Sequence, residues 1–303
     1  MSAPARSRQF TAGLLLALAG SIAFSGKAII VKLAYRHGVD AVTVIMYRML
    51  FALPMFLALS WWATYRARAP VAPLTRADWL GILGLGFSGY YAASFLDFWG
   101  LQYISSSLER LILYLNPTLV LLLGWLRFGR PIRAQQYGAM ALSYAGMLLV
   151  FGHELSFEGR ATLVGGALVF ASAVSYALYL VYSGELVKRI GSLRLVGLAT
   201  SVACLLCLLQ FVVLRPLSAA LVAPEVIWLS LLNAVACTAA PVVMVMLAIE
   251  RIGSGLTAQV GMVGPLSTIS MGVLILGEPF NGWIAAGTAL VLAGVLWVTR
   301  VRA

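Results

Sequence analysis

The sequence predicts an all-α protein that crosses a membrane many times. Hydrophobic residues make up 62% of its 303 residues and charged residues only 10%, whereas an average soluble domain has about 25% charged residues. Long apolar runs recur along the whole chain, each close to the ~20 residues that a helix needs to span a bilayer. The composition excludes a soluble enzyme, and the spacing of the runs leaves no room for a separate soluble domain.

Ten apolar runs, separated by charged or Pro/Gly-rich breaks, predict ten transmembrane helices. The first run follows Arg6 and Arg8 and could be a signal peptide, but it continues to Ala34 without a clear cleavage site, so we expect it to span the membrane. In chain order the predicted spans are 10–34, 42–63, 79–99, 105–126, 134–151, 161–183, 193–214, 226–248, 254–276 and 282–299.

The basic residues predict that both termini are cytoplasmic. A net charge of +11 would suggest nucleic-acid binding in a soluble protein, but Lys and Arg collect in the cytoplasmic loops of membrane proteins. Most of the basic residues fall in the termini and the connections on the same side. The other side has only Arg36, Arg160 and Arg215, with Lys32 counted there as well. We therefore expect a multi-pass protein of the cell inner membrane, surrounded by lipid and without a nucleic-acid partner.

An internal repeat appears when residues 100–150 are placed over residues 248–298 without a gap. Pro117 then coincides with Pro265, and three glycines of one segment also meet glycines of the other. Chance similarity between two Leu/Ala/Gly-rich segments is the alternative. If each repeat has five helices, the odd number makes the two halves insert in opposite orientations, as in many secondary transporters. The expected division is 1–152 for the first repeat and 153–303 for the second.

Pro117 and Pro265 interrupt equivalent predicted helices. A proline removes a backbone donor and frees a carbonyl, which is tolerated where neighbours or a water-filled cavity satisfy it. We predict that these two prolines are paired hinges, with simple kinking for packing as the alternative.

Ten helices in two repeats, with Gly277-Glu278-Pro279 closing the ninth and Pro265 within it, resemble the drug/metabolite transporter superfamily, specifically its EamA-type exporters. The size and arrangement also resemble aromatic amino acid exporters of the YddG type. The resemblance covers nearly the whole chain, although Arg130 stands in the first half where Glu278 stands in the second. It implies a basket of helices with a substrate cavity between the repeats, lined chiefly by helices 1, 3, 4, 6, 8 and 9.

Ionisable residues inside the predicted spans are candidates for function, because burying a charge in the bilayer is costly. Their positions along the helices predict that all lie in the outer third of the membrane. Lys27 and Asp97 lie at matched depth, so we expect an ion pair, and with Glu109 an outer polar gate or vestibule. For Arg48 and Arg110, snorkelling to the outer headgroups remains an alternative.

The predicted midplane is uncharged and rich in tyrosine. Such a set suits a pocket that stacks an apolar or aromatic group and offers hydroxyls to a polar head, although packing or interfacial anchoring of each tyrosine is the alternative. The predicted pocket residues are Ser21, Tyr90, Tyr91, Ser94, Tyr114, Asn116, Tyr176, Tyr179, Thr238 and Gln259.

We expect no metal site and no cofactor. Cys204 and Cys207 have a C-x-x-C spacing but lie in an apolar stretch, which favours packing over redox or metal chemistry. Residues 20–27 resemble a phosphate-binding loop but have one residue too many and lie inside a helix, which excludes an ATPase. No nucleophile and base pair suggests an enzyme.

The sequence therefore predicts a secondary transporter that exports small amphipathic metabolites. Amino acids with aromatic or apolar side chains are the expected substrates, moved by alternating access around a central cavity. An exchanger of phosphorylated metabolites or nucleotide sugars is the alternative within transport, and a membrane-embedded enzyme or scaffold is the alternative outside it. Without a midplane carboxylate, exchange or uniport is favoured over proton antiport. The oligomeric state is left open, and a monomer is compatible with the sequence.

Overall fold

The computed structural model describes residues 3–65, 73–129, 131–261 and 263–302, and every regular element within these ranges is a helix. Seven stretches are long and apolar enough to cross a membrane: Gln9–Tyr35, Ala41–Tyr65, Arg76–Gly100, Ser106–Phe128, Arg160–Gly184, Ser192–Leu214 and Pro224–Val245. Two shorter apolar stretches, Val263–Leu276 and Gly282–Trp297, follow. The chain is therefore a polytopic helical protein, while the count of ten spans and the cytoplasmic termini stay predictions.

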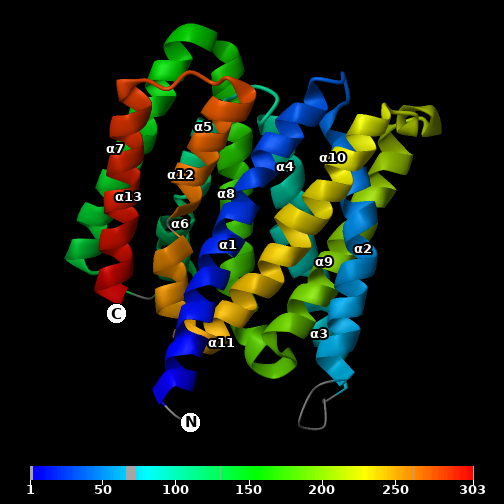
Figure 1. Ribbon diagram of the computed structural model, residues 1–303, viewed down its shortest axis with the longest axis vertical. Helices are drawn as coiled ribbons and strands as arrows, with labels where there is room; N and C mark the ends of the chain where they lie inside the picture. The colour runs from blue at the N-terminus through cyan, green and yellow to red at the C-terminus, as the bar shows by residue number, and fades with distance from the viewer. Residues whose placement is uncertain (1–2, 66–72, 130, 262, 303) are drawn as a thin grey trace.

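The helices lie side by side in a bundle, and the chain begins and ends at the same end of it (Figure 1). The α-helices are α1 (Ala3–Tyr35), α2 (Ala41–Tyr65), α3 (Arg76–Leu85), α4 (Ala93–Gly100), α5 (Ser106–Leu113), α6 (Asn116–Phe128), α7 (Ala134–Glu158), α8 (Arg160–Ile190), α9 (Ser192–Leu214), α10 (Pro224–Ala234), α11 (Ala240–Gly261), α12 (Val263–Met271) and α13 (Gly282–Arg302).

Three π-helical segments and one short 3₁₀ helix complete the chain. The π segments are η1 (Gly86–Ala92), η3 (Val235–Ala239) and η4 (Gly272–Leu276), and the 3₁₀ helix is η2 (Leu217–Ala220). Segment η1 joins α3 to α4 and η3 joins α10 to α11, so both lie within long helices. Wide π turns inside α-helices often mark functional sites, because they free backbone carbonyls.

Helices from the two halves of the sequence pack against each other throughout the bundle. Helix α2 packs against α9, and α7 against α13. Helix α1 contacts α10, η3, α11 and α12, while α8 contacts η1, α4, α5 and α6. The interior between α1 and α8 is therefore built from segments far apart in the sequence.

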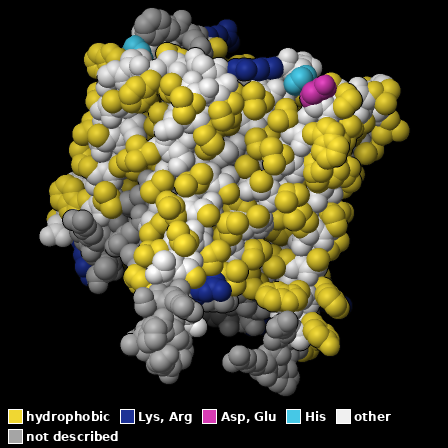
Figure 2. All heavy atoms as spheres, in the orientation of Figure 1, with side chains coloured by type: hydrophobic (Ala, Val, Ile, Leu, Met, Phe, Trp, Pro, Cys, Tyr) yellow, Lys and Arg dark blue, Asp and Glu magenta, His cyan; other side chains and the backbone are white. Residues whose placement is uncertain are grey.

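The outer surface of the bundle is apolar over its middle. Figure 2 shows hydrophobic side chains covering most of one face, with charged and histidine side chains gathered toward its two ends. Large apolar side chains are fully presented to the surroundings, such as Leu274 (82% exposed) and Leu80 (71% exposed). A surface of this kind is stable in lipid, where no water is available to hydrate polar groups.

Two helix boundaries differ from the prediction. Helix α7 continues to Glu158, so the predicted division between residues 152 and 153 lies inside it, and the chain turns at Gly159 with φ of 55°. Helix α11 runs from Ala240 to Gly261, across the predicted break between 248 and 254. The predicted break contains the charged residue Arg251, but charge does not interrupt helical hydrogen bonding as a proline does. Residue 262, between α11 and α12, lies outside the described residues.

Candidate functional site: a central cavity between the halves

A cavity of about 350 Å³ lies in the interior of the bundle. Helices from both halves line it. The lining residues are Ser21, Phe24, Lys27, Arg48, Gly89, Tyr90, Ala93, Ser94, Asp97, Arg110, Leu113, Tyr114, Asn116, Ser172, Tyr176, Thr238, Val242 and Gly261. Its volume is in the range of small-molecule binding sites in proteins.

Most of the predicted pocket residues do line this cavity. They are Ser21, Tyr90, Ser94, Tyr114, Asn116, Tyr176 and Thr238. Tyr179 lies behind the wall: it is 5% exposed, and its ring centroid is 5.2 Å from that of Tyr90 and 5.5 Å from that of Tyr176. Tyr91 is also outside the lining, with its ring 5.4 Å from that of Phe87. The side chain of Gln259 lies outside the described residues.

Side chains of helix α8 donate hydrogen bonds to the backbone of the π segment η1 and to that of Ala93, the first residue of α4. Ser175 donates to the carbonyl of Ser88 over 2.8 Å, and Ser172 donates to the carbonyl of Ala93 over 2.7 Å. Because a π turn shifts the helical hydrogen-bond register, such carbonyls need outside donors. These bonds hold η1 against α8 and so fix Tyr90 and Tyr176 at the cavity wall.

Lys27 and Asp97 form the predicted ion pair, from α1 to α4. The Lys27 Nζ atom also lies 3.4 Å from Oε1 of Glu109 on α5, so one ammonium faces two carboxylates. Glu109 is fully buried and Asp97 is 2% exposed. Glu109 is not part of the cavity lining, whereas Lys27 and Asp97 are.

The predicted separation of a neutral pocket from a charged vestibule is wrong. Lys27, Arg48, Asp97 and Arg110 line the same cavity as the tyrosines. The prediction estimated the depth of each residue by counting along a straight helix, and this ignores the direction of the side chain. Helical side chains lean toward the N-terminal end of their helix, which brings Lys27 and Asp97 back toward the cavity. The argument against a carboxylate near the pocket fails as well, since Asp97 lines it.

Two arginines line the cavity, and the sequence-based list of pocket residues omitted both. Arg48 is 5% exposed, so it does not snorkel. Its Nε donates to Oγ1 of Thr238 over 3.1 Å and its guanidinium carbon lies 5.0 Å from the ring centroid of Phe98. Its Nη1 is buried without a hydrogen-bond partner. A buried guanidinium with an unused donor is suited to a carboxylate or phosphate ligand.

Arg110 makes contacts of the same kinds as Arg48, and its Nε is likewise buried without a hydrogen-bond partner. Its Nη2 donates to Oγ of Ser25 over 2.9 Å, and its guanidinium carbon lies 5.6 Å from the ring centroid of Tyr114. Ser25 in turn donates to the carbonyl of Gly264 over 2.8 Å. The position of both arginines inside predicted spans marked them as candidates for function, but it did not show that their side chains line the cavity.

Pro117 lies in the first turn of α6, which resumes after an interruption, and Pro265 lies at the start of α12, where the preceding residue 262 is outside the described residues. Helix α5 ends at Leu113 and α6 begins at Asn116, and α11 ends at Gly261 before α12 begins at Val263. Tyr114 donates from its hydroxyl to the carbonyl of Gly261 over 2.7 Å. The interruption between α5 and α6 therefore borders the cavity, as does Gly261, whose carbonyl is satisfied by Tyr114. Whether these prolines act as hinges stays a prediction.

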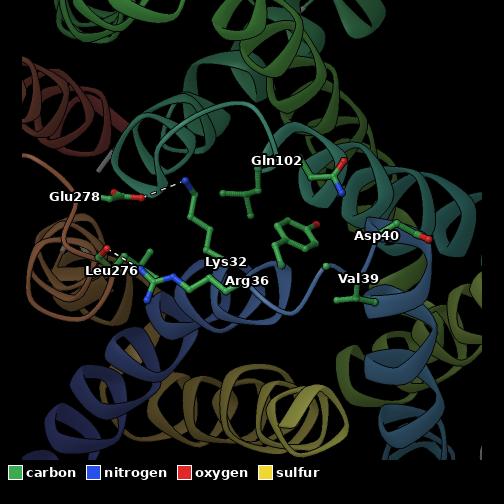
Figure 3. Close-up of a pocket in the computed structure, with 10 residues that line it drawn as sticks. Lys32, Arg36, Val39, Asp40, Gln102, Leu276 and Glu278 are labelled. Atoms are coloured by element: carbon green, nitrogen blue, oxygen red, sulfur yellow. Dashed lines mark hydrogen bonds and ion pairs between the residues drawn. The ribbon is translucent and has the colours of Figure 1, made fainter. Parts of the chain in front are cut away.

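A second, wider hollow of about 610 Å³ opens at one end of the bundle, and Figure 3 shows its lining. Glu278 dominates the polar contacts there. It accepts from the backbone N–H of Ser106 over 2.8 Å and from its hydroxyl over 2.7 Å, and Lys32 Nζ lies 3.3 Å away. Arg36 donates to the carbonyl of Leu276 over 2.7 Å. Glu278 thus caps α5 and ties it to α1.

The motif Gly277-Glu278-Pro279 has a structural explanation in this end of the molecule. Gly277 has φ of 75°, a left-handed conformation that glycine adopts without strain. It ends η4 and sends the chain to Glu278, which meets the first turn of α5. Arg130, which replaces this glutamate in the first half, lies outside the described residues.

Comparison with known proteins shows which family this chain matches. The model of the EamA-like transporter family matches residues 11–152 and again residues 163–300. The chain belongs to the EamA-like transporter family. Among its relatives is an uncharacterized transporter, YcbK of Bacillus subtilis (strain 168), which is 30% identical over 284 residues that cover 89% of this chain and 87% of YcbK.

Other relatives are more distant. Uncharacterized transporter YoaV of Bacillus subtilis (strain 168) is 20% identical over 72% of this chain and 73% of its own length. A solved crystal structure matches with a TM-score of 0.64 and 17% identity, covering 96% of this chain and 97% of the other. That similarity supports the fold alone. The EamA chain is therefore a multi-pass membrane transporter, and its relatives leave the substrate unspecified.

Proposed function

We propose that this EamA transporter exports small amphipathic metabolites that carry a carboxylate, with aromatic or apolar amino acids as its main substrates. The observation that carries the proposal is the composition of the central cavity. Arg48 offers a buried Nη1 without a partner, while Tyr90, Tyr114, Tyr176 and Phe24 supply aromatic surface. A carboxylate would bind Arg48 in a charge-assisted hydrogen bond, and the apolar side chain of the substrate would stack on the rings.

Transport would follow alternating access between two inverted five-helix repeats, with both termini in the cytoplasm of a bacterial-type inner membrane. Two observations support the repeat. The family model matches the chain twice, in its first and second halves. The π segments η1 and η3 also coincide under the shift that superposes Pro117 and Pro265. Rocking one repeat against the other would expose the cavity to each side in turn.

An exchanger of phosphorylated metabolites is the second candidate, because three cationic side chains, Lys27, Arg48 and Arg110, line the cavity. The contacts of two of them weigh against it. Lys27 is bound by Asp97 and Arg110 is bound by Ser25. Arg48 and Arg110 each retain one unused buried donor, Nη1 and Nε respectively, while Lys27 is already neutralised, a set that suits one carboxylate better than a phosphate dianion.

Counterflow in proteoliposomes tests the proposal. The purified chain is reconstituted with unlabelled substrate inside, and uptake of labelled tryptophan, phenylalanine, methionine or threonine is followed beside a nucleotide sugar. We expect exchange of the aromatic and apolar amino acids and none of tryptamine, which lacks the carboxylate. Exchange of the nucleotide sugar while all amino acids fail would favour the second candidate. Absence of any flux in sealed vesicles would favour an enzyme or scaffold.

A further inference from the structure

The buried carboxylates of Glu109 and Asp97 share one cation, which is unusual inside a membrane bundle. Lys27 binds Asp97, and its Nζ lies 3.4 Å from Glu109 without making a hydrogen bond to it. Both oxygens of Glu109 and Oδ1 of Asp97 are buried and lack a hydrogen-bond partner. Two carboxylates and one ammonium leave one negative charge uncompensated within the group.

The surroundings of Glu109 compensate its charge only in part. The charged groups that act on it are Asp97 from α4, Lys27 from α1 and its own neighbour Arg110. Arg110 is directed to Ser25 and Tyr114, and Arg48 from α2 to Thr238. Helices α7, α8, α12 and α13 also pack against α5. Helix α7 brings Glu154, which accepts from Ser105 at the start of α5, and the described part of α12 has no charged side chain. Glu278 approaches α5 at Ser106, one turn before Glu109, and there it is bound by Ser106 and Lys32.

We propose that Glu109 and Asp97 form a proton site, switched by Lys27, that couples export of a zwitterionic substrate to uptake of a proton. This inference rests on the proposed function, because it requires a substrate with an ammonium group. A buried carboxylate without hydrogen bonds is stable in its neutral form, and two carboxylates that share a site retain a proton between them. In the resting arrangement Glu109 holds this proton and Lys27 binds ionised Asp97.

Substrate binding then displaces the proton. The substrate carboxylate binds Arg48 and its ammonium takes the place of Lys27 at Asp97, which lines the cavity. Lys27 moves the short distance to Glu109, whose ionised form it now compensates. The O–H bond of Glu109 breaks, and the proton leaves to water on the side to which the cavity is open. After the substrate departs on the opposite side, a proton returns to Glu109 and Lys27 returns to Asp97.

This cycle makes proton and substrate mutually exclusive, which is the requirement for antiport. It also gives Glu109 a role although it does not touch the cavity, since Lys27 connects it to Asp97. The geometry thus replaces the expectation of uniport with one of proton-coupled export.

The wild-type chain provides the first test. Proteoliposomes are loaded with phenylalanine and a trapped pH-sensitive dye. Phenylalanine is then allowed to flow outward down its concentration gradient. Antiport predicts that the lumen acidifies as phenylalanine leaves, and that an acidic lumen drives uphill uptake of labelled phenylalanine. Phenylalanine counterflow without any proton movement would overturn the proton site and leave the proposed function standing. Absence of counterflow for every amino acid would overturn the proposed function, and the coupling with it.

The Glu109→Gln variant tests whether Glu109 is part of the proton site. Glutamine has the same shape but no titrating proton, so we expect uptake driven by the pH gradient to be lost while counterflow is retained. The matched control is Glu225→Gln, since Glu225 is exposed in the first turn of α10 and should behave as wild type. Asp97→Asn is the second variant, and it should also uncouple uptake from the gradient. Full gradient-driven uptake in both variants would overturn the assignment.

Discussion

The central cavity and the end of the bundle around Glu278 are both rich in polar side chains, but they use them differently. At the Glu278 end, the carboxylate accepts from Ser106 twice and pairs with Lys32. In the cavity region, Arg48, Asp97, Asn116 and Glu109 each have a buried polar atom without a hydrogen-bond partner. Buried polar groups are normally satisfied. We therefore assign a stabilising role to the first region and propose the second as the ligand site.

Replacing Arg48 should have the largest effect on transport. Arg48→Gln removes the charge that would bind the substrate carboxylate, and hydrogen bonds to charged groups contribute about 1.5–3 kcal/mol, so KM in counterflow should rise about 10- to 100-fold. Arg215→Gln is the matched control, because Arg215 pairs with Asp40 outside the cavity. An unchanged KM in Arg48→Gln would mean that the cavity does not bind the substrate through this arginine.

Exchanging the partners of the central ion pair should have the next largest effect. Lys27→Asp and Asp97→Lys should each abolish most transport, because each leaves two like charges buried together. The double variant restores opposite charges at the same place, so it should recover part of the counterflow rate. If the double variant is as inactive as the single variants, transport depends on the identity of each residue and not on the ion pair between them.

Glu278→Gln should affect stability rather than affinity. The amide loses the charged cap of α5 and the ion pair with Lys32, a loss of about 1 kcal/mol in the free energy of unfolding. We expect a lower melting temperature in detergent and an unchanged KM. A changed KM with an unaltered melting temperature would reverse the roles assigned to the two regions.

The smallest effect is expected at Asp40, which lies in the connection between α1 and α2. Partial burial raises its pKa, but hydrogen bonds from Arg215 and from the N–H of Thr43 outweigh this, so the pKa of Asp40 is lowered overall. A lowered pKa stabilises the fold above the pKa of the unfolded chain, about 3.9, and this stabilisation is lost as pH falls through the folded value.

Asp40→Asn should therefore lower the melting temperature slightly at pH 7, by less than about 1 kcal/mol in stability because the ion pair is partly exposed. Between pH 5 and pH 3 (about one unit either side of the unfolded pKa) the difference from wild type should shrink. A difference that grows on acidification would contradict the assigned sign.

The sequence was sufficient to predict a helical membrane protein and the contact between Lys27 and Asp97. Apolar runs set the spans because lipid satisfies no backbone group, and the cost of burying charge favours pairing. The burial of Arg48 could not be read in the same way. Its span is apolar on every side, so hydrophobic periodicity does not reveal which face is directed inward.

The π segments and the course of α11 also escaped prediction, for a related reason. Tyr90 and Tyr91 are adjacent in η1, but only Tyr90 lines the cavity. A local change of helical register decides which of them is directed inward, and it leaves no trace in composition. Tyr179 has the right spacing from Tyr176 but packs behind it. Contacts between the two halves determine these positions, and one half alone does not contain that information.

A structure of the chain with a bound amino acid tests the account most directly. With tryptophan at saturating concentration, we expect its carboxylate within hydrogen-bonding distance of the Arg48 guanidinium, its ammonium beside Asp97, and its indole against Tyr90 and Tyr176. Tryptophan bound instead in the hollow lined by Lys32 and Glu278, with Arg48 still unpartnered, would contradict the account.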